Sequence, residues 1–110
     1  GIAVVEYIPA ASQSLGTLTV ASEAGTAAVG DTILSVSEDL AAGGKLYAKA
    51  ASGTAPSAPA FGAALDSTWT QIPASGLFKT TNGYKVQVVE VNGTGQAIAA
   101  GSATVVAKTA

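Results

Sequence analysis

Apolar residues in this chain alternate with polar ones over short stretches, a pattern typical of half-buried β-strands and not of amphipathic helices. The alternation is clearest in residues 84–106, YKVQVVEVNGTGQAIAAGSATVV, where two strand-forming runs flank an Asn-Gly-Thr-Gly turn. Val86, Val88 and Glu90 fall on one face of the first run, and the opposite face is also apolar near its end. A strand that is apolar on both faces is typical of the centre of a sheet.

The same alternation indicates strands along the rest of the chain. Gly and Pro interrupt every window, so no helix is expected. Strands are expected at residues 4–8, 16–21, 32–36, 45–50, 66–72 and 77–81. In the second of these Leu18 and Val20 share a face, and in the fourth Leu46 and Ala48 lie opposite Tyr47.

The segments between these strands carry turn residues. Residues 22–30 are expected to form a loop, and the Pro-rich residues 51–60 a surface loop or an edge segment. Leu40, in the connection after the 32–36 strand, is expected to plug the end of the core. Asn82-Gly83 is typical of a type I′ hairpin turn, because both central positions of that turn require positive φ.

Short strands separated by frequent turn signals are typical of a β-sandwich. Seven to eight strands in about 100 residues predict an all-β, immunoglobulin-like β-sandwich, with a barrel as the alternative. Trp69, the only tryptophan, is the expected core anchor. Residues 1–9 are expected to form an N-terminal arm or edge strand, and residues 10–110 the sandwich domain.

The amino-acid composition limits the kinds of molecule that this chain can bind. Charged side chains make up 11% of the 110 residues, the net charge is −2 and the pI is about 4.7. The five lysines are scattered and arginine is absent, so no nucleic acid is expected as a partner. Mean hydropathy is +0.42, but no apolar run approaches the ~20 residues of a spanning helix, so membrane insertion is not expected. No basic region precedes the first apolar run, so an intact export signal is not expected either.

Most side chains that catalysis requires are missing. The absence of His and Cys excludes Ser-His-Asp and Cys-His nucleophilic sites and argues against zinc or copper. The carboxylates are Glu6, Glu23, Asp31, Glu38, Asp39, Asp66 and Glu90. Only Glu38 and Asp39 adjoin, and adjacent side chains point apart, so they do not form a glycosidase pair. Lys45 and Lys49 suit an exposed strand face better than a Ser–Lys dyad. The sequence therefore predicts a protein that is not an enzyme, with no catalytic residue, cofactor or metal.

Two weaker signals have simpler explanations. Four carboxylates lie between expected strands and could converge on calcium, namely Glu23, Asp31, Glu38 and Asp39. No D-x-D-x-D spacing is present, and solvated loop carboxylates account for them more simply. Residues 92–94 match the N-glycosylation sequon, but a tight hairpin also favours Asn and Gly for their backbone angles.

The segments GTLTVAS, VGDTILSVS, GGKLYAKA and GYKVQVVEVNGTGQAIAAGSATVV follow one another in the chain. This order resembles the immunoglobulin-like modules of bacterial surface-layer proteins and of phage head proteins. Those modules carry a GDT turn into a Val-rich strand, a Tyr-containing strand, a G-x-x-V-x-V-V-E-V-[DN] strand and a closing A-G-x-A-T-V strand. The likeness covers about residues 16–106 and departs at residues 51–60, which are unusually rich in Ala and Pro. It implies a structural module displayed on an assembly.

The apolar N-terminal run is the best lead to a partner. A free strand can pair with its own sheet or with the sheet edge of a neighbour. The low surface charge favours the neighbour, because an isolated soluble monomer normally carries more charge. The expected partner-contact residues are Ile2, Val4, Val5, Tyr7 and Ile8.

These features predict a structural protein of a large homo-oligomeric or icosahedral assembly. The leading interpretation is a virion-surface protein that decorates a phage capsid and binds the major capsid protein or copies of itself. An apparently complete chain, no export signal and an apolar arm favour it. The first alternative is a subunit or module of an exported bacterial or archaeal surface layer, pilus or filament. The second is a carbohydrate-binding or adhesion module, with Tyr7, Tyr47, Trp69 and Tyr84 as its possible sugar platforms.

Overall fold

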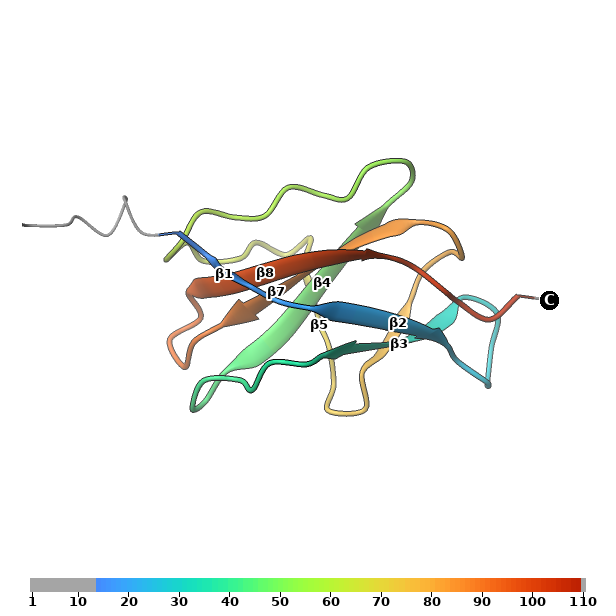
Figure 1. Ribbon diagram of the computed structural model, residues 1–110, viewed down its shortest axis with the longest axis horizontal. Helices are drawn as coiled ribbons and strands as arrows, with labels where there is room; N and C mark the ends of the chain where they lie inside the picture. Colours follow the sequence, from blue (N-terminus) through green and yellow to red (C-terminus); the bar gives the residue numbers. More distant parts are fainter. Residues whose placement is uncertain (1–13, 110) are drawn as a thin grey trace, which may run out of the picture.

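The computed structural model describes residues 14–109 (Figure 1). Every regular element within them is a β-strand. The strands are β1 (Gly16–Thr17), β2 (Val20–Ala24), β3 (Asp31–Val36), β4 (Lys45–Ala51), β5 (Thr70–Gln71), β6 (Leu77–Lys79), β7 (Lys85–Val91) and β8 (Ala97–Thr104). The edge strand predicted at residues 4–8 lies outside the described residues.

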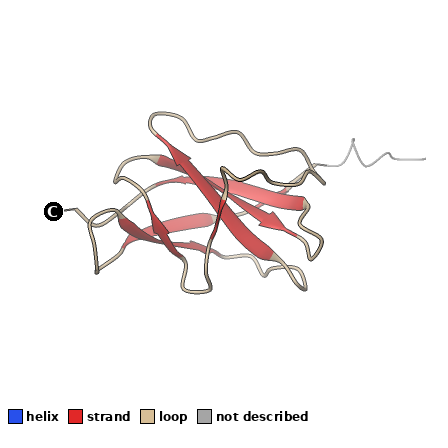
Figure 2. Ribbon diagram, turned by 180° about the vertical axis from the view of Figure 1, so that it is seen from behind, coloured by secondary structure: helices blue, strands red, loops and turns tan. Residues whose placement is uncertain are grey.

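The strands form two sheets. One has the order β1-β8-β7-β4-β5 and the other β2-β3-β6. β1 lies parallel to β8, and the other pairs are antiparallel. With β1 and β2 as two halves of one first strand, this order corresponds to the C-F-G and A-B-E strands of an immunoglobulin-like sandwich. Figure 2 shows the strands from behind. The predicted all-β sandwich is confirmed, and the strands within residues 14–109 form two separate sheets instead of the alternative barrel.

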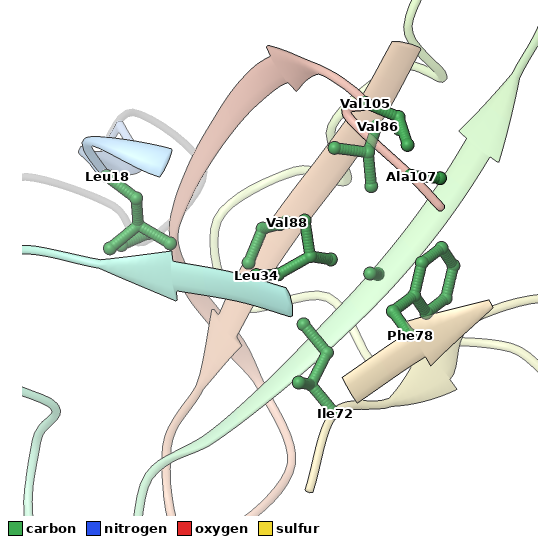
Figure 3. Close-up of a cluster of buried hydrophobic side chains, with 10 residues drawn as sticks. Leu18, Leu34, Ile72, Phe78, Val86, Val88, Val105 and Ala107 are labelled. Atoms are coloured by element: carbon green, nitrogen blue, oxygen red, sulfur yellow. The ribbon is translucent and has the colours of Figure 1, made fainter. Parts of the chain in front are cut away.

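The core lies between the sheets and is built from small aliphatic side chains (Figure 3). Successive strand residues point to opposite faces, so β7 sends Val86 and Val88 into this core while Val89 lies on the other face. β7 pairs with β4 on one edge and β8 on the other, which confirms the predicted central strand. The labelled core residues are Leu18, Leu34, Ile72, Phe78, Val86, Val88, Val105 and Ala107.

The first strand changes sheets at Leu18 and Thr19. The Leu18 N–H donates to the Ala100 carbonyl of β8 at 2.9 Å, whereas the Thr19 carbonyl accepts from the Ser37 N–H, just after β3, at 3.2 Å. The crossing chain runs very close to β8, because a Cβ atom at Gly101 would lie 2.1 Å from the Leu18 carbonyl oxygen. Glycine is therefore required at this crossing for steric reasons.

Two strand boundaries differ from those expected from the sequence. The single strand expected at residues 16–21 is divided at Leu18, because its hydrogen-bond partner passes from β8 to β3. β2 then extends to Ala24, into residues 22–30 that were expected to form a loop. The polar–apolar alternation runs through Leu18 without a break and is lost at Ala21 and Ser22, so it revealed neither change.

Asn82-Gly83 does not form the predicted type I′ hairpin. Gly83 has φ +88°, but no non-glycine residue of the described chain has positive φ. The turn joins β6 of one sheet to β7 of the other, so its flanking strands do not pair. The Tyr84 N–H donates to the Thr81 carbonyl at 3.1 Å, and Asn82 Oδ1 accepts the Ala107 N–H at 3.0 Å. The turn thus connects the two sheets and holds the C-terminal segment.

Two residues expected in the core lie elsewhere. Leu40 is 40% exposed and lines an open hollow of about 360 Å³, so it does not plug the core. Trp69 packs on the outer face of the five-stranded sheet, and the strand expected at residues 66–72 shortens to β5. Phe78 and Ile72 fill the core instead. Both errors concern residues outside strongly alternating runs, where the sequence carries no signal for burial.

Candidate assembly surfaces

The arm residues predicted to contact a partner lie outside the described residues: Ile2, Val4, Val5, Tyr7 and Ile8. The described chain begins beside β1 at one end of the sandwich and leaves at the opposite end (Figure 1). In the described part of the chain, no helix is long and apolar enough to cross a membrane.

The C-terminal segment is fixed to the body by backbone hydrogen bonds. The Val105 N–H donates to the Tyr84 carbonyl at 2.7 Å, and the Gly83 N–H donates to the Val105 carbonyl at 2.9 Å. The Lys108 carbonyl then accepts from the Gly30 N–H, and the Lys108 N–H donates to the Asp31 carbonyl, each at 2.9 Å. The chain therefore leaves the sandwich in a defined direction.

The outer face of the five-stranded sheet is covered by the long connection between β4 and β5, residues 52–69. Its Pro56 carbonyl accepts a hydrogen bond from the Gln87 side chain of β7 at 3.0 Å. Further along, residues 62 and 63 exchange two hydrogen bonds of 2.8 Å with Ala97 of β8. The segment expected at residues 51–60 as a surface loop or edge is thus part of a cover over this sheet.

A second apolar cluster forms beneath that cover. Val89, Val91 and Ala97 are its buried members, and Leu15, Tyr47, Leu65, Trp69 and Ala100 pack against them. The Lys49 ammonium lies 5.5 Å from the centre of the Trp69 ring, within the range of a cation–π contact. Tyr84 packs against the other core, between the sheets. The three aromatic platforms proposed for sugar that fall within the described residues therefore do not gather on one surface.

No segment of residues 14–109 covers the outer face of the three-stranded sheet. Its outward side chains are Ala21 and Glu23 of β2, Asp31, Ile33 and Ser35 of β3, and Leu77 and Lys79 of β6. All are exposed except half-buried Ile33 and Asp31, which is buried beside Lys79. This surface was not expected, because residues 22–30 were interpreted as a loop. Polar–apolar alternation is lost at Ala21 and Ser22, so the sequence carries no clear signal for it.

Two carboxylates, half-buried Glu38 and exposed Asp66, hold loops through hydrogen bonds. The Glu38 carboxylate accepts the Thr19 N–H at 2.7 Å and the Thr19 hydroxyl at 2.8 Å, and these bonds lower the pKa of Glu38 below its ordinary value. The Thr68 hydroxyl and its N–H, the latter at 2.9 Å, donate to Asp66 and lower the pKa of that carboxyl. Both groups hold backbone turns in place.

The buried carboxylates are also structural. Asp31 accepts the Ala28 N–H at 3.1 Å and lies 3.4 Å from the Lys79 ammonium. Glu90 is 5% exposed and accepts the Ala41 N–H at 2.7 Å. Among residues 14–109 no three carboxylates gather at a point that could hold a metal ion. The four loop carboxylates considered for calcium are therefore not brought together.

The β7–β8 turn accounts for the apparent sequon. Asn92 Oδ1 accepts the N–H groups of Thr94 and Gln96, each at 3.0 Å, and the Thr94 hydroxyl at 2.7 Å. Gly95 has φ +85° and supplies the left-handed position of the turn. Asn92 thus acts through its side chain and not, as expected, through its backbone angles.

Comparisons with known proteins place this fold beside surface-layer proteins. No protein-family model matches the chain, and no curated protein matches it. The crystal structure of domains 7, 8 and 9 of the S-layer protein SbsC aligns with a TM-score of 0.69 at 23% identity, covering 83% of this chain and 29% of that one. The structure of domains 4–9 of surface layer protein SbsC aligns with a TM-score of 0.67 at 27% identity, covering 94% of this chain and 18% of that one. This chain thus spans less than a third of either structure. The two matches support the surface-layer half of the resemblance and give no support to the phage half.

Proposed function

We propose that this chain is a non-catalytic structural domain of an exported surface layer, situated at the cell surface. The observation that carries the proposal is the fold shared with SbsC domains over 83% and 94% of this chain. The matched shares of those structures, 29% of three domains and 18% of six, are close to one domain each. The chain therefore has the extent of a single unit in a row of such domains.

The position of the chain ends supports a place in such a row. The described chain starts at one end of the sandwich and leaves at the other (Figure 1). Its last part is hydrogen-bonded to residues 30, 31 and 84, so a following domain would have a defined orientation. Connections of this kind give a stiff strand of domains.

The partners in this proposal are neighbouring domains or copies of the chain itself. The apolar residues Ile2, Val4, Val5, Tyr7 and Ile8 are proposed to contact such a neighbour, because a short apolar strand can extend the sheet of another subunit. Many copies in a layer would turn a weak contact into a strong one through avidity.

Localisation tests the proposal directly. An antiserum against the purified chain is expected to label intact cells of the organism that encodes it, without permeabilisation. A cytoplasmic protein detected in parallel controls for lysis. Labelling only after permeabilisation, or labelling confined to purified virions, would contradict the surface-layer function.

The arm is tested separately by deletion of residues 1–8. We expect the truncated chain to keep the melting temperature of the sandwich and to lose incorporation into the layer. A full-length variant with Ala10 and Ala11 replaced by Ser is the control, because it leaves the apolar run intact. Normal incorporation of the truncated chain would exclude the arm as a contact.

A further inference from the structure

The two outer faces of the sandwich differ in what covers them. Residues 52–69 cover the five-stranded sheet, whereas no described segment covers β2, β3 and β6. On this open face Ile33 lies between its cross-strand neighbours Glu23 and Leu77, and Lys79 follows two residues along β6. Leu77 is 45% exposed although it lies on a regular strand.

We propose that this open face, formed by Glu23, Ile33, Leu77 and Lys79, docks against the same face of a second copy of the chain. The two copies are related by a two-fold axis parallel to the strands. That rotation preserves position along the strands and exchanges the two edges, so β2 of one copy lies over β6 of the other. The two Ile33 side chains then meet near the axis.

The charges on this face are self-complementary. Glu23 lies at the β2 edge and Lys79 at the β6 edge, so the rotation sets each carboxylate against an ammonium of the other copy. The two lie one row apart along the strands, about 7 Å, which long side chains span. Lys79 contacts Asp31 of its own chain at 3.4 Å, but its side chain is 67% exposed and can reach outward. An acidic partner would meet repulsion at Glu23, whereas the Lys79 ammonium of a second copy would attract that carboxylate, which favours a second copy.

The size of the face predicts a weak contact that works by repetition. The strands β2, β3 and β6 have five, six and three residues and cover roughly 220 Å² per copy, from the ordinary strand spacing and rise. Stable interfaces bury about 800 Å² per partner, so an isolated pair dissociates readily. The inference rests on the proposed layer for its biological setting, where many such contacts act together.

Charge reversal provides the test, and the purified chain is sufficient for it. Glu23→Lys gives a face with two lysines and Lys79→Glu gives one with two glutamates, with Asp31 present in both. Each variant is expected to repel itself and to attract the other. Unlabelled Lys79→Glu, added at low ionic strength to ¹⁵N-labelled Glu23→Lys, should shift amide signals of β2, β3 and β6. Unlabelled Glu23→Lys should cause no such shifts. Salt at about 0.5 M should abolish the shifts caused by Lys79→Glu, because it screens exposed charges.

A second pair of variants keeps the test decisive if Lys79→Glu, which places a carboxylate beside Asp31, fails to fold. Concentration-dependent shifts of the wild-type chain should fall several-fold with Leu77→Ser. They should remain with Val29→Ser, which removes a 56% exposed aliphatic side chain from the loop between β2 and β3. No shifts on mixing or concentrating, or shifts on the five-stranded sheet, would overturn the inference. Such a result would leave the surface localisation untouched, because antiserum labelling of cells does not depend on this face.

Discussion

We expect Gly101→Ala to be strongly destabilising, because Gly101 lies where the first strand crosses between the sheets. A Cβ atom there would lie 2.1 Å from the Leu18 carbonyl oxygen, 2.9 Å from its carbonyl carbon and 3.1 Å from its Cβ. Gly101 does not have positive φ, so the effect is steric and not conformational. The obstructing atoms belong largely to backbone, which cannot rotate away as a flexible side chain can.

The expected loss of stability follows from the atoms that must move to accommodate the new Cβ. Leu18 has to retreat by roughly 1 Å to reach the shortest contacts that Cβ atoms make. This movement strains its 2.9 Å hydrogen bond to Ala100 and disturbs a side chain that is only 5% exposed. Overpacking costs about 1–3 kcal/mol and a lost hydrogen bond about 1 kcal/mol, so we expect about 2–4 kcal/mol in total. For a domain of this size that lowers Tm by roughly 10–25 °C.

Thermal unfolding followed by circular dichroism measures this loss, and amide exchange at Leu18 locates it. Gly93→Ala is the matched control, because Gly93 also lacks positive φ and the nearest atom to its added Cβ is 4.0 Å away. We expect the control to melt within about 3 °C of the wild type. A Gly101→Ala chain as stable as the control, with Leu18 protected from exchange, would refute the close crossing.

Four further substitutions test the roles assigned to other residues. The folded-state pKa of Glu38 is lowered, so its ionised form stabilises the fold above its ordinary pKa of 4.5, and this contribution is lost as pH falls through the lower folded value. Glu38→Gln should therefore flatten the decline of Tm below pH ~5, and an unchanged decline would contradict the clamp. Glu90→Ala leaves a backbone N–H without its acceptor and should cost about 1–3 kcal/mol in urea unfolding. Phe78→Ala should cost about 3–5 kcal/mol and Trp69→Ala less, whereas equal losses would assign Trp69 to the core.

The sequence predicted the elements whose burial is local and periodic. The alternation of Val86 and Val88 with their neighbours identified a central strand, and β7 does pair on both edges. Likewise, Ala48 and Tyr47 of β4 were expected on opposite faces, and they are found in different apolar clusters. In both strands the face on which a residue lies depends on whether its position is odd or even, and a single sequence shows this directly.

Pairing between distant segments could not be predicted in the same way. Asn82-Gly83 has the composition of a hairpin turn, but its flanking strands pair with β3 on one side and with β4 and β8 on the other. The sheet change at Leu18 likewise depends on Gly101, 83 residues away in the chain. Turn composition fixes local backbone angles, whereas the partner of each strand is set by the whole topology.

The open face of the three-stranded sheet was not predicted, for a related reason. Glu23 was placed in a loop because Gly residues follow it, so the outward positions of β2, β3 and β6 that form the open face were never considered together. Trp69 was placed in the core on size alone, but the core is filled by smaller residues and Trp69 covers the opposite side of the five-stranded sheet. Exposure of a face depends on which loops fold over it, and no local pattern encodes that.

The position of β1 gives the close crossing a mechanical role in the proposed row of domains. A domain joined to neighbours at opposite ends is pulled along the line between those ends. β1 is the first strand and β8 the last, and they run parallel with Gly16 beside Ala99 and Thr17 beside Ala100. Such a force shears all hydrogen bonds between the two strands at once, whereas a hairpin pulled from its open end would separate one bond at a time. Gly101 allows the chain to leave β1 directly across β8, so the same glycine that preserves stability also holds together the two strands that would bear the load.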